Sequence, residues 1–500
     1  MIRNAREPRL VNVGTDDPRH TLTPTIVGVG ATLIVVACRS SSSQFASYTL
    51  LAFGCGVFLA PQVVNPRLRL RVDQPLCPSN WAWLLFAIQL VVQPILIFLF
   101  GVYQGQLAIL PSPVSIEMSF LLSCAAYLAF SVGLSAVLAR PTRQGHLGAR
   151  LDSVPAGVTI AFVVVGLLAV VWRFRSASEL FSYFTGGYIG AGVTQGGSSL
   201  SDTASTFLRP FGAYGLILLW ARVASRRSVH RMLLVVCTAG ALAILATYNY
   251  NRAAVVIPLV ALGAAYGRHI KRLSFRTVLT FGLIVLLAAF AFGNFRRIQI
   301  GTEGGKYTLQ QANLTTTPSL EQNVQLYGAA PQFSAVVVQN LSSGAGYYFG
   351  STLVNSVLAP LPIAGRTARP GSGTTLYNQL AYGRPGIVDQ VIPFAAELDW
   401  NFGVFGVVLG FLVLGLVVAR LQRAFDVSDG IVSSFVLQYF AMWSAFLIIG
   451  SIQVVVQIFV YFSLPVLVLA LLRRRRTAVG PDGPTTGLRP VETGGVLRVH

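Results

Sequence analysis

The chain has 500 residues, of which 54% are hydrophobic and only 11% are charged. This composition excludes an ordinary soluble globular protein and is typical of a membrane protein. The formal net charge of +20 would indicate nucleic-acid binding in a soluble protein, but here the basic residues lie in short clusters between apolar segments, where such clusters orient membrane helices. We therefore expect no nucleic-acid partner. The five cysteines show no Cys-x-x-Cys spacing, so the sequence predicts neither a zinc site nor a disulfide framework.

A polar, arginine-rich tail at 1–23 precedes the first apolar segment. A helix that crosses a bilayer needs about 20 apolar residues. On that criterion the sequence predicts an all-α polytopic membrane protein with about 12 transmembrane helices. They are expected near 24–38, 46–64, 81–103, 117–139, 153–172, 206–221, 232–249, 253–267, 277–294, 401–419, 431–450 and 453–472. The first nine helices occupy 24–294 and the last three occupy 401–472.

The basic clusters alternate with these spans and fall on the side of the N-terminal tail. Lys and Arg are enriched in cytoplasmic loops, so we expect that side to be cytoplasmic. Both termini would then be cytoplasmic, including a basic tail at 473–500 that we expect to be disordered because it is rich in Gly and Pro. The polar segment 295–400 would form one large extracytoplasmic loop. The clusters begin at Arg67, Arg140, Arg222, Arg268, Arg420 and Arg473.

Arginines on the external side are the exceptions to this pattern. They are Arg39, Arg173, Arg175, Arg209, Arg252, Arg296, Arg297, Arg366, Arg369 and Arg384. Because a guanidinium binds phosphate through paired donors, several of them together would suit a diphosphate-linked lipid. The alternative is that each one snorkels or pairs with an acidic residue. Arg252, in a tight turn between two spans, is the first candidate, and Arg296, directly after another span, is the second.

The external loop contains an apolar stretch from Gly344 to Gly365 that is interrupted by Pro360 and Pro362. It is too short and broken to cross a membrane, so we expect an interfacial or re-entrant helix. The stretch that follows, 366–378, combines two arginines, Tyr377 and several hydroxyl groups. Such a mixture suits phosphate and sugar contacts, and it is equally ordinary in a solvated loop.

Glu397 stands immediately before the tenth predicted span, in a chain with only 17 acidic residues. Close to a membrane surface, a carboxylate is either paired with Arg or has its pKa raised toward the range of a general base. The first outcome is structural and the second is catalytic. Gly403 and Gly406, which follow, allow close approach of another helix or a ligand.

These features resemble those of the bacterial oligosaccharide repeat-unit (O-antigen, Wzy-like) polymerases. The resemblance is carried by Glu397-x-x-x-Asn401-Phe402-Gly403-x-x-Gly406 at the start of a late span, by Leu361-Pro362 with the Arg-rich 366–370 segment, by the Asn251-Arg252 turn and by the topology. It implies GT-C-like architecture in the cytoplasmic (inner) membrane of a bacterium. It further implies polymerisation of polyprenyl-diphosphate-linked repeat units on the outer face of that membrane, without a metal or other cofactor.

Transfer from a polyprenyl diphosphate needs cations for the leaving group and a base near the acceptor hydroxyl. From the resemblance we expect Arg252 and Arg296 at the diphosphate and Glu397 as the base or as the residue that orients an arginine. Asn401 would bind a sugar or hold Glu397. Further expected substrate contacts are Arg297, Arg366, Arg369, Tyr377 and Arg384.

Three alternatives remain open at this stage. A ligase that moves finished glycan to another acceptor would use the same donor. A transporter or flippase would be expected to show related halves, whereas the long loop occurs once in this sequence. The third is a non-catalytic subunit of a glycan-export complex. Partners of the polymerase would be the lipid-linked glycan, the bilayer and, as candidates, a chain-length regulator and a flippase.

Overall fold

A computed structural model of the chain describes residues 47–71, 74–103, 110–139, 154–174, 200–224, 231–246, 253–274, 276–280, 328–361, 363–382 and 392–478, with a few isolated positions. These residues form helices and turns and contain no strand, which confirms the prediction of an all-α fold. The predicted span at 24–38 and most of the one at 277–294 lie outside the described residues. Every other predicted span coincides with a helix.

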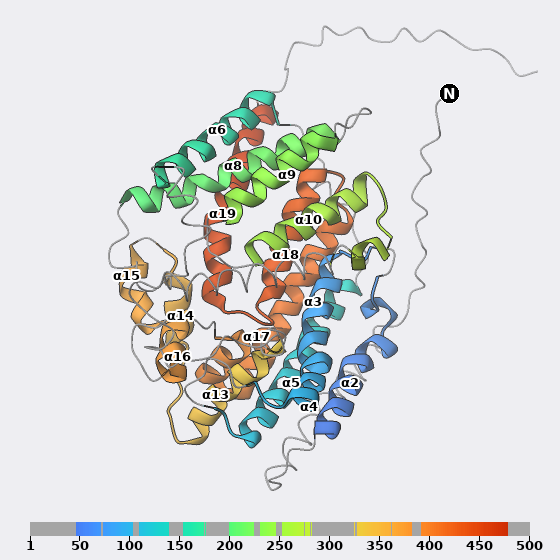
Figure 1. Ribbon diagram of the computed structural model, residues 1–500, viewed down its shortest axis with the longest axis vertical. Helices are drawn as coiled ribbons and strands as arrows, with labels where there is room; N and C mark the ends of the chain where they lie inside the picture. Colours follow the sequence, from blue (N-terminus) through green and yellow to red (C-terminus); the bar gives the residue numbers. More distant parts are fainter. Residues whose placement is uncertain are drawn as a thin grey trace, which may run out of the picture.

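Long helices form the body of the protein, and the short helices, which follow α10 and precede α17 in the chain, lie at its side and lower end in Figure 1. The long ones are α2 (Ser47–Val64), α3 (Pro78–Ala87), a π-helical turn (Ile88–Val92) continuing into α4 (Gln93–Phe100), α5 (Pro113–Leu138), α6 (Ala156–Arg173), α8 (Leu200–Ala224), α9 (Arg231–Ala246), α10 (Ala253–His269), α17 (Phe394–Asp426), α18 (Ile431–Phe446) and α19 (Ile452–Ala478). The short ones are α13 (Ala330–Ser342), α14 (Ser351–Leu358), α15 (Ala364–Ala368), the 3-10 turn η4 (Arg369–Gly371) and α16 (Gly373–Tyr382).

Five of the described helical segments are long and apolar enough to cross a membrane. They are Pro78–Ile97, Pro113–Leu138, Ala156–Arg173, Phe394–Asp426 and Ile452–Leu472. Four more are apolar but shorter: Phe53–Val64, Met232–Leu245, Val255–His269 and Ile431–Phe446. Length and composition therefore support a membrane protein, while a count of 12 spans goes beyond these helices.

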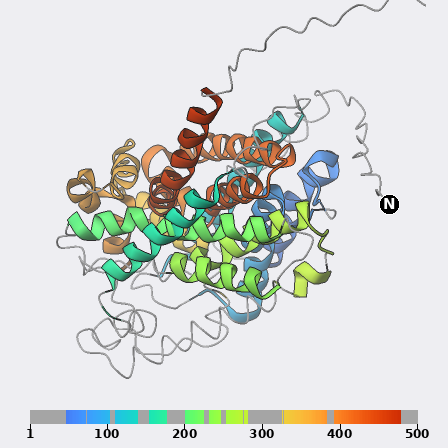
Figure 2. The same cartoon turned by 90° about the horizontal axis from the view of Figure 1, so that it is seen from above.

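Two packed groups of helices make up the body. In the first, α6, α8 and α9 lie side by side in both views and pack with α10, α18 and α19 (Figures 1 and 2). Gly166 of α6 faces Gly212 of α8 so closely that a Cβ on Gly166 would lie 2.0 Å from the Gly212 nitrogen. In the second, α3, α5 and α17 meet through the rings of Phe86, Phe130 and Phe411. Small residues and aromatic rings thus bring the backbones together, as in membrane helix pairs.

Basic residues that are far apart in the sequence meet at the end of α17. Arg71, after α2, forms an ion pair with Asp426 at the end of α17, with 2.8 Å between Nη1 and Oδ1. Arg268 of α10 donates to the carbonyls of Asp426 and Ser428, and Arg67 Nη1 donates to the Ala139 carbonyl at 3.1 Å. The clusters that begin at Arg67 and Arg268 therefore lie together at the end of α17, as the alternation of basic segments predicts for these two.

The short helices lie at the opposite end. The Ser112 N–H, just before α5, donates to Gln339 Oε1 of α13 at 2.7 Å. Phe333 and Val337 of α13 also pack with Trp400 near the start of α17. Helices α5 and α17 therefore run in the same direction between the two ends. Figure 1 shows α14, α15 and α16 as one group at the side of the bundle, next to α19.

Candidate functional site

The candidate site is the junction between the short helices and the start of α17. This helix begins at Phe394, and its backbone breaks at Gly403, where φ is 64° and ψ is −162°. A residue with a Cβ rarely adopts such a φ, which explains why glycine is needed there. Glu397 and Asn401 lie on the helical piece before the break, one turn apart, and so project from the same face.

Asn401 joins α17 to the start of α14. Its side chain is fully buried. Its Oδ1 accepts from the Gly350 N–H at 2.8 Å, and its Nδ2 donates to Thr352 Oγ1 and to the Glu397 carbonyl, both at 2.6 Å. The loop before α14 is held in addition by the Tyr348 N–H, which donates to the Trp400 carbonyl at 3.1 Å. Asn401 thus fixes the N-terminal end of α14.

Glu397 joins α17 to α14 and α16. Its carboxylate is fully buried, and Oε1 accepts from Ser356 Oγ at 2.6 Å. The Ser356 hydroxyl in turn accepts from the Gly373 N–H, the first residue of α16, at 3.0 Å. A Cβ on Gly373 would lie 2.3 Å from Oε1, so the carboxylate rests directly against the start of this helix. The position suits an anion, because the first N–H groups of a helix are unsatisfied and carry partial positive charge.

Glu397 has no cation partner among the residues that the structure describes. The ion pair found there, between Arg71 and Asp426, lies at the other end of the bundle. Glu397 Oε2 has no hydrogen-bond partner among the described residues. Of the two outcomes expected for this residue, pairing with a described arginine does not occur. The carboxylate keeps one oxygen available for a proton donor.

The six arginines that were expected to contact the substrate fall into two groups, those outside the described residues and those within them. Arg252, Arg296, Arg297 and Arg384 lie outside the described residues. Arg366 is exposed on α15, and Arg369 is half-buried, with its Nε donating to the Ala359 carbonyl at 3.1 Å. The second group therefore belongs to the same short helices that Glu397 and Asn401 hold.

Tyr377 is placed in the core beneath these helices. It is fully buried in α16, and its hydroxyl donates to the Phe333 carbonyl at 3.0 Å. Burial raises the pKa of Tyr377 above its usual value, so the phenol stays protonated and serves as a donor. The segment 366–378, which was expected to be a loop, is largely helical, since it contains parts of α15, η4 and α16. The hydrogen bond of Tyr377 joins α16 to α13.

Arg209 is a further member of this region. The sequence indicated only that it is one of the external arginines. It is buried in α8, 5% exposed, where its Nη2 donates to Thr206 Oγ1 at 3.2 Å. Phe207 of the same helix packs against Tyr461 of α19, with 4.9 Å between the ring centres, and the Tyr461 hydroxyl donates to the Pro360 carbonyl at 3.0 Å. An arginine followed by Pro210 inside an apolar segment was the only signal in the sequence.

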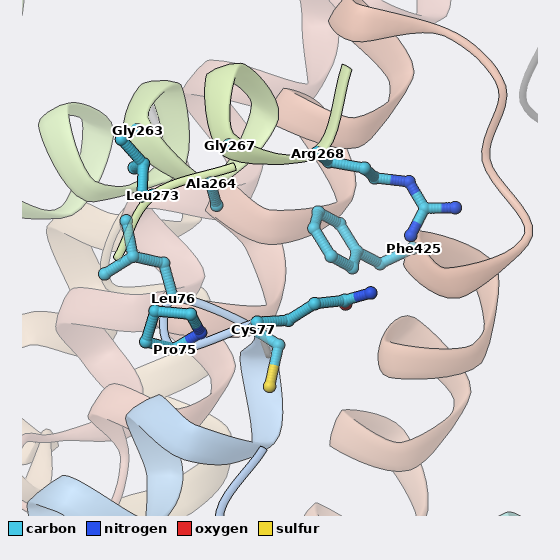
Figure 3. Close-up of a pocket in the computed structure, with 10 residues that line it drawn as sticks. Pro75, Leu76, Cys77, Gly263, Ala264, Gly267, Arg268, Leu273 and Phe425 are labelled. Atoms are coloured by element: carbon cyan, nitrogen blue, oxygen red, sulfur yellow. The ribbon is translucent and has the colours of Figure 1, made fainter. Parts of the chain in front are cut away.

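A separate cavity of about 30 Å³ lies at the basic end of the bundle. Figure 3 shows Leu76 and Cys77 on one side of it and Gly263 of α10 on the other, with Arg268 beside Phe425. The guanidinium of Arg268 lies 5.1 Å from the centre of the Phe425 ring. A space of this size holds water but not a sugar or a diphosphate. We therefore place the candidate site at the α14–α17 junction.

Neither a metal nor a relative directs this choice. Within the described ranges, no three His, Cys, Asp or Glu side chains gather in a way that could hold a metal ion. No family model, curated protein or solved structure matches the chain. The junction combines a buried carboxylate at the start of an apolar helix with short helices that carry Arg366 and Arg369.

Proposed function

We propose that the chain is a membrane glycosyltransferase that polymerises polyprenyl-diphosphate-linked oligosaccharide repeat units on the outer face of a bacterial cytoplasmic membrane. The observation that carries this proposal is Glu397, a buried carboxylate without a cation partner among the described residues, set between an apolar helix and an arginine-bearing group of short helices. About 12 spans in a GT-C-like arrangement, with both termini in the cytoplasm, belong to the same proposal.

The reaction assigns each group a task. The acceptor hydroxyl attacks the anomeric carbon of the donor, and the bond from that carbon to the diphosphate oxygen breaks. Glu397 takes the proton of the hydroxyl, for which a positioned base contributes about 10²–10⁴-fold in rate. Arg369, together with the arginines expected from the sequence, stabilises the charge that develops on the leaving diphosphate. Gly373 and Ser356 cover Glu397 in this structure, so the acceptor reaches the carboxylate when the start of α16 moves aside.

Substitution of Glu397 tests the assignment. Glu397→Gln keeps an oxygen that accepts from Ser356 but cannot take a proton, so we expect a folded protein that no longer elongates. Asp399→Asn is the matched control, because Asp399 is a second buried acid two residues away that forms no ion pair with a described residue. It should leave the polymer unchanged.

The assay is purified protein in liposomes with a synthetic lipid-linked repeat unit, read as product length on a gel. A ladder that is lost in Glu397→Gln and kept in Asp399→Asn supports the proposal. A full ladder from Glu397→Gln removes Glu397 from the chemistry. A single addition to a foreign acceptor would identify a ligase instead, and the absence of any covalent product would favour a transporter or an assembly subunit.

A further inference from the structure

Apolar side chains are exposed on the outer side of α14 and in the turns that flank it. Val354 and Val357 lie three residues apart and share a face of the helix, while Thr352 and Ser356 on the other face are buried. Phe349 before the helix is 79% exposed and Ile363 after it is 87% exposed. We call Phe349, Val354, Val357 and Ile363 the α14 patch.

The α14 patch continues onto the surface of α17. Gly350 lies against Phe402, since a Cβ on Gly350 would be 3.1 Å from the ring. On the same junction, a Cβ on Gly403 would be 3.5 Å from the Tyr347 hydroxyl oxygen. Beyond the break, Phe405 is 74% exposed and is followed at helical spacing by Leu409 and Val413, which are also exposed. The outer surface of a candidate membrane helix and that of α14 therefore form one apolar area.

Phe349 is held in an unusual conformation within this area. Its φ is +47°, in the left-handed region that bulky residues rarely adopt. The hydrogen bonds of the Tyr348 and Gly350 N–H groups to Trp400 and Asn401 hold the backbone on both sides. A glycine at this exposed position would relieve the strain. We infer that the aromatic ring of Phe349 is kept for a contact that the ring makes.

We propose that the α14 patch is seated in the outer leaflet of the bilayer and contacts phospholipid. Exposed side chains on a helix that crosses a membrane meet hydrocarbon, and the patch adjoins that surface through Tyr347, which packs against Phe349, with 6.3 Å between the ring centres. Helix α14 has eight residues, about 12 Å, so it lies along the interface and does not cross. Arg366, exposed three residues after Ile363, sits where a guanidinium reaches lipid phosphates.

This inference rests on the membrane location and on the extracytoplasmic placement of 295–400 in the proposed function, and not on the enzymatic assignment. It sets the level of the candidate site: because α14 also binds Glu397 through Ser356, the carboxylate lies close to the plane of the outer headgroups. A lipid-linked substrate would present its diphosphate at that same level.

Spin labelling tests the inference. Cysteines at Phe349 and Val357, introduced one at a time after replacement of the five native cysteines, carry a nitroxide in phospholipid liposomes. Collisions with oxygen, which concentrates in hydrocarbon, should exceed collisions with a water-soluble nickel chelate at both sites. Ser343→Cys, at an exposed polar position after α13, is the control and should show the opposite order. Preferential nickel collisions at 349 and 357 would place the patch in water and overturn the inference, and protection from both reagents would mean that protein covers it.

A second measurement keeps the five native cysteines and an aromatic side chain at position 349. Benzoylphenylalanine in place of Phe349 keeps an aromatic group at the position and crosslinks to its neighbour on irradiation. We expect an adduct with the mass of a phospholipid. A protein adduct, or an adduct with a prenyl lipid alone, would show another occupant and overturn the proposal.

Discussion

Replacement of Asn401 by alanine should release α14 from α17. The substitution removes the acceptor for the Gly350 N–H and the donor for Thr352 Oγ1. Thr352 is fully buried, so its hydroxyl loses a partner that water cannot replace. A buried polar group without a partner costs about 1–3 kcal/mol, and the half-buried Gly350 N–H costs less. We expect the free energy of unfolding to fall by about 2–4 kcal/mol.

The free energy is measured by denaturant titration in mixed micelles, and the local effect by limited proteolysis of the α14–α16 segment. The matched control is Asn355→Ala, because the half-buried Asn355 side chain donates one hydrogen bond from Nδ2 to the Gly371 carbonyl, at 3.2 Å, among the described residues. It should cost about 0.5–1.5 kcal/mol. In a double-mutant cycle, Asn401→Ala and Thr352→Val should show a coupling energy of about 1 kcal/mol. An Asn401→Ala variant as stable and as protease-resistant as the parent would refute the role assigned to these contacts.

Three glycine substitutions give further predictions. Gly373→Ala places a Cβ 2.3 Å from Glu397 Oε1, so it should displace the carboxylate from Ser356 and abolish chain elongation, read from glycan length. Gly403→Ala forces an alanine to φ +64° and ψ −162°, a region that is essentially restricted to glycine, and should lower the free energy of unfolding by about 1–3 kcal/mol. Gly166→Ala must separate α6 from the Gly212 backbone of α8 and should destabilise the protein by about 1–3 kcal/mol, seen as a lower midpoint in the same titration.

The chain offers controls for these variants. Gly346 precedes α14 and Gly157 lies in α6, and a Cβ on either would meet nothing within 4 Å. Gly346→Ala should therefore preserve elongation, and Gly157→Ala should match the parent in stability or exceed it because alanine favours a helix. Equal losses from Gly373→Ala and Gly346→Ala would show that the loop as a whole, and not contact with Glu397, controls activity.

Hydropathy alone located the long helices, because a segment of about 20 apolar residues is a local property that neighbours do not alter. Even the short spans expected at 232–249 and 253–267 coincide with α9 and α10. The boundaries near the site were less predictable. The tenth span was expected from residue 401, whereas α17 begins at Phe394 and breaks at Gly403, since its first turns are stabilised by packing against the short helices.

What the sequence determined by itself is the class of the protein and its long helices, since these follow from composition and hydropathy. It also singled out Glu397, as a rare acidic residue directly before a span, and Asn401, through the resemblance to a known family. Only the tertiary structure decided what they contact: Ser356, Gly373 and Thr352 lie 24 to 49 residues away in the chain, and no local pattern brings them together. It likewise buried Tyr377 and Arg209, because burial is set by the packing of segments that are distant in sequence.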